Sequence, residues 1–150
     1  MKLSYSLDGP GWATVVIRDG RSEFSITVSY LHDSLCNLAQ SAVDLRDGEA
    51  SSIVVFMDEP GEHHLVLSRS DDDALHVELQ WFDDWASWDM YPADQFEVVY
   101  KGQTNVKEFV AAVSIVLNSV LAEWGIDGYK KKWIEHPFPK KLHKKLDVTE

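Results

Sequence analysis

Apolar and polar residues alternate in two short stretches near the N-terminus. In residues 23–28 every second side chain is apolar, which is the period of a strand in a sheet with one solvated face. Residues 12–18 are dense in β-branched residues, and Asp19-Gly20 between the two stretches suits a tight turn because glycine tolerates positive φ. The pattern predicts an antiparallel hairpin.

A helix is predicted after this hairpin. Its apolar residues recur at steps of three and four and so share one stripe: Leu31, Leu35, Leu38, Ala42 and Leu45. Ser29 or Asp33 can cap the first turn, and Gly48 can end the helix. Cys36 lies beside the stripe, where we expect a packed thiol.

Four further strands are predicted between residues 52 and 100. Residues 52–57 form a continuous apolar run, residues 64–68 return after a turn, and residues 96–100 supply the last strand. Residues 75–82 alternate most regularly, with one set expected to face inward and the other outward: Leu75, Val77, Leu79 and Trp81, against His76, Glu78, Gln80 and Phe82.

A long helix is predicted from Asn105 to Trp124. Glu108 stands three residues after Asn105, as in a capping box, and Gly125 can end the helix. A broad apolar stripe suits packing on a sheet: Val106, Phe109, Val110, Val113, Val116, Leu117, Val120, Leu121 and Trp124. We expect Leu75, Val77, Leu79 and Trp81 to face this stripe.

These elements predict one α+β domain over residues 1–150, in the order β-β-α-β-β-β-β-α. The expected architecture has two layers: a mainly antiparallel sheet of about six strands, with the long C-terminal helix and the shorter helix packed on it. A segment rich in lysine and aromatic residues, 129–150, follows the long helix, helical at first and then extended around its prolines.

The charge is unevenly distributed. The net charge is −11, and residues 58–97 alone contain twelve acidic side chains and one basic side chain, Arg69. Residues 129–150 contain seven basic and three acidic side chains. A field of this sign repels phosphate backbones and attracts a basic partner, so we expect no direct nucleic-acid binding. Solubility alone is the alternative explanation of the acidic total. The lysines can solvate a helix end or pair with the acidic segment.

The composition favours a reducing, aqueous compartment. Cys36 is the single cysteine, so no internal disulfide can form. The first ten residues lack the apolar region of a secretory signal, and the apolar stretch 106–124 contains Lys107, Glu108 and Glu123. We therefore expect a cytoplasmic protein without a membrane span.

Aromatic and acidic residues are interleaved in residues 81–94, which hold three of the six tryptophans. Interfaces concentrate binding energy in tryptophan and tyrosine anchors surrounded by polar groups. The expected partner-facing residues are Asp83, Asp84, Trp85, Trp88 and Asp89, with Asp71, Asp72 and Asp73 at the rim. The alternative for Trp85 and Trp88 is that they fold onto the sheet and cap the core.

Motifs for metal or catalytic chemistry are not apparent. In Glu62-His63-His64 neighbouring side chains of a strand would point to opposite faces, so we expect no metal or other cofactor there. The run 71–73 lacks the spacing and the glycine of a calcium loop. No nucleophile or phosphate-loop motif is present, so we expect a non-catalytic protein. An active site assembled from distant residues would leave no such motif, so an enzyme stays as an alternative.

The ending of the chain follows the pattern Y-x-x-x-W-x-x-x-P-F-P-x-x-L, formed by Tyr129, Trp133, Pro137, Phe138, Pro139 and Leu142. With the order of elements and the acidic surface, this ending resembles bacterial immunity proteins, which are encoded beside polymorphic or contact-dependent toxins. The resemblance implies stoichiometric occlusion of a toxin's active site or of the surface by which the toxin binds a required partner, and it assigns no individual functional residue. A basic toxin such as a nuclease would suit the acidic field. A binding or scaffold module in another bacterial process is the alternative.

Overall fold

The structure, a computed structural model, describes residues 1–147. It opens with an antiparallel sheet in the order β1-β2-β3, formed by β1 (Lys2–Leu7), β2 (Trp12–Asp19) and β3 (Ser22–Ser29). Gly20 adopts a φ of 59° at the turn between β2 and β3, where Asp19 pairs with Ser22. The predicted hairpin is therefore confirmed.

Strand β1 was not predicted. Its alternate residues Leu3, Tyr5 and Leu7 are buried, while the lysine and serines between them are exposed. The residues have the period of a strand, but half of them are polar and the run is only six residues long. The fold therefore begins one strand earlier than the sequence pattern indicated.

The second sheet is also antiparallel, in the order β4-β5-β6-β7. It consists of β4 (Ser51–Met57), β5 (Glu62–Asp71), β6 (Ala74–Phe82) and β7 (Glu97–Asn105). A short 3-10 turn, η1 (Ala86–Trp88), lies in the loop between β6 and β7. Residues 1–147 thus contain seven strands in two sheets, rather than about six strands in one.

Three helices complete the described chain: α1 (Ser34–Arg46), α2 (Val106–Lys132) and α3 (Lys140–Leu146). The side chain of Asn105 accepts a 2.8 Å hydrogen bond from the backbone N–H of Glu108, which confirms the predicted cap. Gly125, with φ 68° and ψ 177°, interrupts the regular helix where its end was predicted, and a further helical stretch follows to Lys132. Helix α3 was not predicted.

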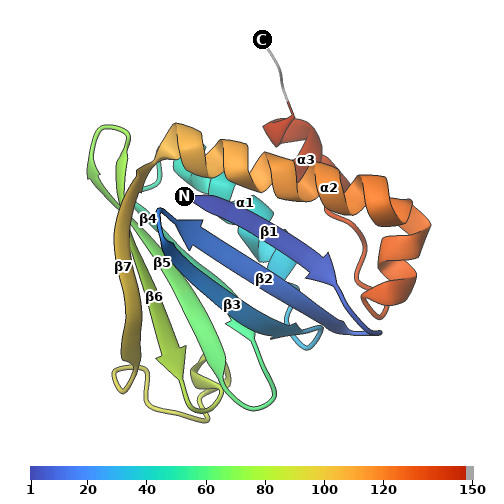
Figure 1. Ribbon diagram of the computed structural model, residues 1–150, viewed down its shortest axis with the longest axis horizontal. Coiled ribbons are helices and arrows are strands. Elements are labelled where there is room, and N and C mark those ends of the chain that lie inside the picture. The colour runs from blue at the N-terminus through green and yellow to red at the C-terminus, as the bar shows by residue number, and fades with distance from the viewer. Residues whose placement is uncertain (148–150) are drawn as a thin grey trace.

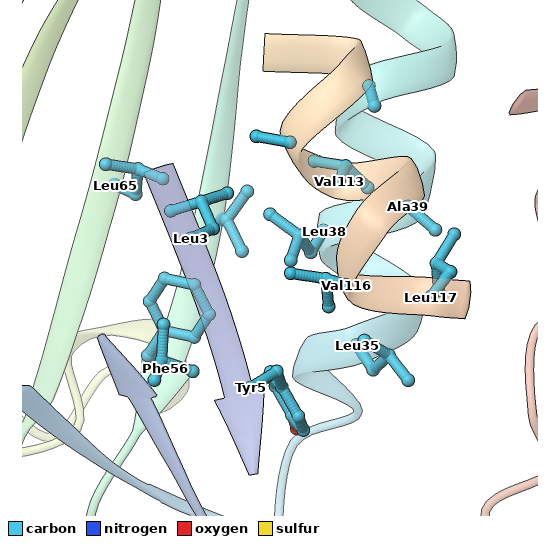
Figure 2. Packing of buried hydrophobic residues seen from close by; sticks show 14 of the residues in the cluster. Leu3, Tyr5, Leu35, Leu38, Ala39, Phe56, Leu65, Val113, Val116 and Leu117 are labelled. Carbon is cyan, nitrogen blue, oxygen red and sulfur yellow. The ribbon is translucent and has the colours of Figure 1, made fainter. Parts of the chain in front are cut away.

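The two sheets and the helices share one hydrophobic core. Helix α2 packs mainly against α1 and β1, and the close-up shows Val113 and Val116 near Leu38 and Leu3 (Figures 1 and 2). Leu75, Val77 and Leu79 of β6 reach the same core, whereas Trp81 lies outside it, and α2 does not lie directly on this strand. This arrangement corrects the expectation that residues 75–81 face the helix.

The C-terminal segment closes the core. Tyr129 and Trp133 have no exposed surface, and Phe138 is 4% exposed. The Trp133 ring packs edge-on against Tyr5 of β1 at 6.2 Å, and Tyr129 packs against Phe138 at 5.7 Å. Tyr129, Trp133 and Phe138 therefore hold the C-terminal end of α2 against the sheet formed by β1, β2 and β3.

Candidate functional site

The loop that joins β6 to β7, residues 83–96, carries the predicted partner-facing tryptophans. Trp85 is half-buried, and its indole Nε1 donates a 2.8 Å hydrogen bond to the carbonyl oxygen of Asp58 in the turn between β4 and β5. Trp88 is 47% exposed and contacts Trp85 edge-on at 5.1 Å. The two residues thus differ: Trp85 fastens the loop, and Trp88 is presented to solvent.

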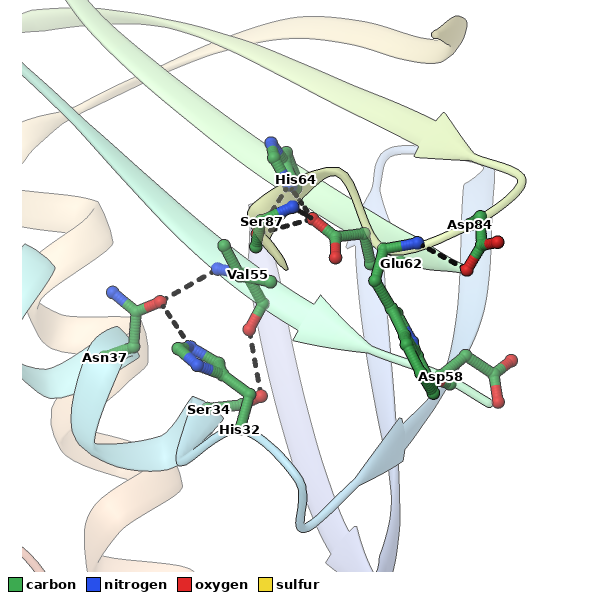
Figure 3. Close-up of polar contacts among 10 residues, drawn as sticks. His32, Ser34, Asn37, Val55, Asp58, Glu62, His64, Asp84 and Ser87 are labelled. Atoms are coloured by element: carbon green, nitrogen blue, oxygen red, sulfur yellow. Dashed lines mark hydrogen bonds and ion pairs between the residues drawn. The ribbon is translucent and has the colours of Figure 1, made fainter. Parts of the chain in front are cut away.

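A buried carboxylate holds the same loop on the sheet. Glu62, the first residue of β5, has no exposed surface. One of its carboxylate oxygens accepts hydrogen bonds from the Ser87 hydroxyl at 2.6 Å, from the Ser87 backbone N–H at 3.2 Å, and from His64 (Figure 3). Two segments that are 25 residues apart in the sequence are thereby joined on the outer face of the second sheet.

Hydrogen bonding decides the charge state of this carboxylate. Burial raises the pKa of Glu62, but the hydrogen bonds from His64 and Ser87 outweigh burial, so the net pKa lies below its ordinary value. Glu62 is therefore ionised at neutral pH. A buried, charged acceptor makes stronger hydrogen bonds than a neutral one, which suits an anchor.

Serine, histidine and glutamate are also the residue types of a hydrolytic triad. In a triad the histidine lies between the nucleophile and the acid and takes the proton of the serine. Here the Ser87 hydroxyl donates to Glu62 and lies 3.5 Å from His64 Nε2, so the carboxylate occupies the central position. We therefore interpret the cluster as an anchor of the loop rather than as an activated nucleophile.

An aromatic cluster lies beneath the anchored loop. Phe82 points to the outer face of the sheet, as predicted, yet it is only 2% exposed. Its ring contacts His64 at 4.3 Å and Phe96 at 5.5 Å. The loop therefore covers apolar surface that a fully solvated sheet face would expose.

The outer surface of the loop combines apolar and acidic side chains. Its exposed apolar residues, continued into β7, are Trp88, Met90, Phe96 and Val98. Its exposed acidic residues are Asp83, Asp89 and Asp94. A shallow hollow of about 490 Å³ lies between Ala86 and Ala93, lined in part by Asp89 and Met90.

Asp71, Asp72 and Asp73 lie elsewhere. Asp71 ends β5, and Asp72 and Asp73 form the turn to β6, whereas the loop of Trp88 leaves the other end of β6 (Figure 1). Strand β6 has nine residues, so the two acidic groups are about 30 Å apart. The structure corrects the expectation that these three aspartates form the rim of the tryptophan surface.

His63 and His64 occupy opposite faces of β5. The His63 ring packs on Trp81 at 4.7 Å, whereas the His64 ring packs on Phe82 on the other face. Burial, with a smaller contribution from His64, lowers the pKa of His63 to about 4. Within residues 1–147 no three potential metal ligands come together.

The lysines of the C-terminal segment do not neutralise the acidic segment. Lys130 forms an ion pair with Glu135 at 3.7 Å, within the same part of the chain. Among the described residues, no ion pair joins residues 129–147 to residues 58–97. The acidic loop surface therefore keeps its charge, contrary to the alternative of internal pairing.

Comparison with known proteins finds no matching family model, no matching curated protein and no matching solved structure. In the candidate site Glu62 and Trp85 fix a loop that carries both exposed apolar side chains and exposed acidic side chains.

Proposed function

We propose that this chain is a non-catalytic protein-binding domain and that the loop 83–96 faces its partner. The partner would be a protein with a basic surface. The narrower proposal, supported by the resemblance to immunity proteins, is neutralisation of a cytoplasmic toxin by covering its active site. A nuclease toxin would fit, because enzymes that bind nucleic acid present basic clefts.

The exposure of Trp88 on a fastened loop carries this proposal. Large apolar side chains on a loop usually fold inward when they have no partner, and Trp85 does so. Trp88 and Met90 remain 47% and 55% exposed although Ser87, beside Trp88, is held by the buried carboxylate of Glu62. A rigid aromatic anchor of this kind loses little conformational entropy on binding.

The surrounding acids support a basic partner. Exposed acidic residues around an apolar centre accelerate encounter with a basic surface and orient it, while the apolar centre supplies affinity. The loop 83–96 lies about 30 Å from the Asp71–Asp73 turn, so a charge reversal in that turn serves as the control for a charge reversal in the loop. At physiological salt the screening length is about 8 Å, so charges at the far end of the sheet contribute little to steering at the loop.

The test is the association rate with the product of the gene directly upstream, measured for two matched charge reversals. Asp94→Lys changes the loop, and Asp72→Lys changes the distant turn. Both residues are exposed, and neither side chain makes a hydrogen bond or ion pair within residues 1–147. Asp83 and Asp84 are less suitable, because Asp83 accepts a hydrogen bond from Trp81 and Asp84 accepts one from the Trp85 backbone.

We expect Asp94→Lys to slow association roughly two- to fivefold at low salt, with the difference disappearing at high salt. Asp72→Lys should leave the rate nearly unchanged. Equal effects of the two reversals would place the interface elsewhere. If the upstream product does not bind at all, the assignment to toxin neutralisation fails.

A further inference from the structure

Two turns of the loop 83–96 form the hollow of about 490 Å³. In the first turn, the backbone N–H of Asp89 donates a 3.1 Å hydrogen bond to the carbonyl oxygen of Ala86. In the second turn, the backbone N–H of Gln95 donates a 3.2 Å hydrogen bond to the carbonyl oxygen of Pro92. Backbone hydrogen bonds therefore fix the shape of the hollow.

The lining of the hollow is apolar apart from one carboxylate. The apolar part comes from small side chains, a thioether, a proline ring and a phenol ring: Ala86, Met90, Tyr91, Pro92 and Ala93. Asp89 is the charged residue of the lining, and it is exposed and forms no ion pair within residues 1–147. No lysine or arginine occurs between Arg69 and Lys101, so β6 and the loop supply no cation of their own.

We propose that this hollow receives an arginine side chain of the protein partner. This inference rests on the proposed function and adds the side-chain chemistry that the loop recognises. The aliphatic stem of arginine suits apolar walls, and its guanidinium offers paired N–H donors to the carboxylate of Asp89. The ring of Tyr91 is a surface on which a planar guanidinium can stack.

Other side chains use only part of the hollow. An apolar side chain would take water away from the carboxylate of Asp89 without giving it a hydrogen bond, which costs free energy. An acidic side chain would meet Asp89 and the exposed Asp83 and Asp94 of the same loop. Lysine carries the charge, but its ammonium group does not form paired, planar hydrogen bonds. Arginine matches both the walls and the carboxylate.

Asp94 provides a matched control for Asp89. Both residues are exposed on the same loop, but only Asp89 lines the hollow. A charge that only steers the partner changes the association rate and is screened by salt, whereas a charge paired in the complex changes the dissociation rate. Asparagine tolerates the left-handed φ of 59° at position 89, so Asp89→Asn removes the charge and keeps the backbone.

The first experiment uses the full chain and a small probe, Nα-acetyl-arginine methylamide, followed by backbone amide chemical shifts in NMR. We expect saturable shifts centred on residues 86–93, with a dissociation constant on the order of 10 mM. The neutral citrulline analogue should bind at least about fivefold more weakly, as should arginine to Asp89→Asn, while Asp94→Asn should bind as the unmodified protein does. No saturable shift, equal binding of arginine and citrulline, or tighter binding of the lysine analogue overturns the proposal.

The second experiment uses the complex with the product of the gene directly upstream. Asp89→Asn should speed dissociation at least about tenfold at both low and high salt, whereas Asp94→Asn should leave the dissociation rate nearly unchanged. A complex that is weakened by Trp88→Ala but dissociates normally with Asp89→Asn would keep the proposed function and overturn the arginine site. If the upstream product does not bind, the arginine probe still decides what the hollow accepts.

Discussion

The hydroxyl of Ser87 donates a 2.6 Å hydrogen bond to Glu62, whose side chain has no exposed surface. This bond joins the loop 83–96 to the start of β5 (Figure 3), and Trp88, the neighbour of Ser87, is 47% exposed. The geometry of the proposed binding surface therefore depends on a buried charge rather than on the exposed residues alone.

Replacing this carboxylate should loosen the loop. We expect Glu62→Gln to lower the free energy of unfolding by about 1–3 kcal/mol, because the amide cannot accept a charge-assisted hydrogen bond from His64. Ser87→Ala should cost about 1 kcal/mol. Urea unfolding followed by tryptophan fluorescence measures both, with the exposed Glu97→Gln as the control. Equal stability of Glu62→Gln and Glu97→Gln would contradict the anchor.

The half-buried His63 should make the fold sensitive to mild acid. Its pKa is lowered from 6.5 to about 4, so the unfolded chain takes up a proton that the folded chain refuses. Stability is therefore lost as the pH falls from about 6.5 toward 4, by about 1–2 kcal/mol at pH 5. His63→Phe keeps the contact with Trp81 and should reduce the difference in unfolding free energy between pH 7 and pH 5. An unchanged difference would exclude His63 as its source.

Truncation of Trp133 and truncation of Trp88 should lower the free energy of unfolding by very different amounts. Trp133 is fully buried against Tyr5, so Trp133→Ala should cost about 3–5 kcal/mol or prevent folding. Trp88 is 47% exposed, so Trp88→Ala should change the unfolding free energy by less than about 1 kcal/mol. Thermal melts of the two variants measure the difference in stability. A large loss of stability in Trp88→Ala would show that Trp88 packs as a core residue.

The pattern of apolar and polar residues predicted which segments form strands and which form helices, because periodicity and capping residues are visible within short stretches of sequence. The cap at Asn105 is confirmed, and the alternation is confirmed for residues 75–79, whereas Trp81 is only half-buried and Phe82 is buried. Strand β1 was missed because serine occupies two of its six positions. The packing of α2 on α1 and β1 could not be predicted, since an apolar stripe does not specify which neighbour covers it.

The candidate site was only partly accessible from sequence. Glu62 stood in a histidine-containing cluster, but its hydrogen-bond partner Ser87 lies 25 residues further along the chain. One local signal was available: Phe82 on an outward position of its strand indicates that something covers that face. The position of Asp72 at the opposite end of β6 also follows from the predicted strand, whereas a count of charge over residues 58–97 conceals it.

The central claim is that Trp88 anchors a protein partner. The most direct measurement is the dissociation rate of the complex with the upstream gene's product, for Trp88→Ala and for the control Ile53→Ala, which also truncates an exposed apolar residue. The account predicts that both variants fold, that Trp88→Ala dissociates about thirtyfold faster or more, equivalent to about 2 kcal/mol, and that Ile53→Ala dissociates as the unmodified protein does. A folded Trp88→Ala variant that dissociates at the unmodified rate would contradict the account.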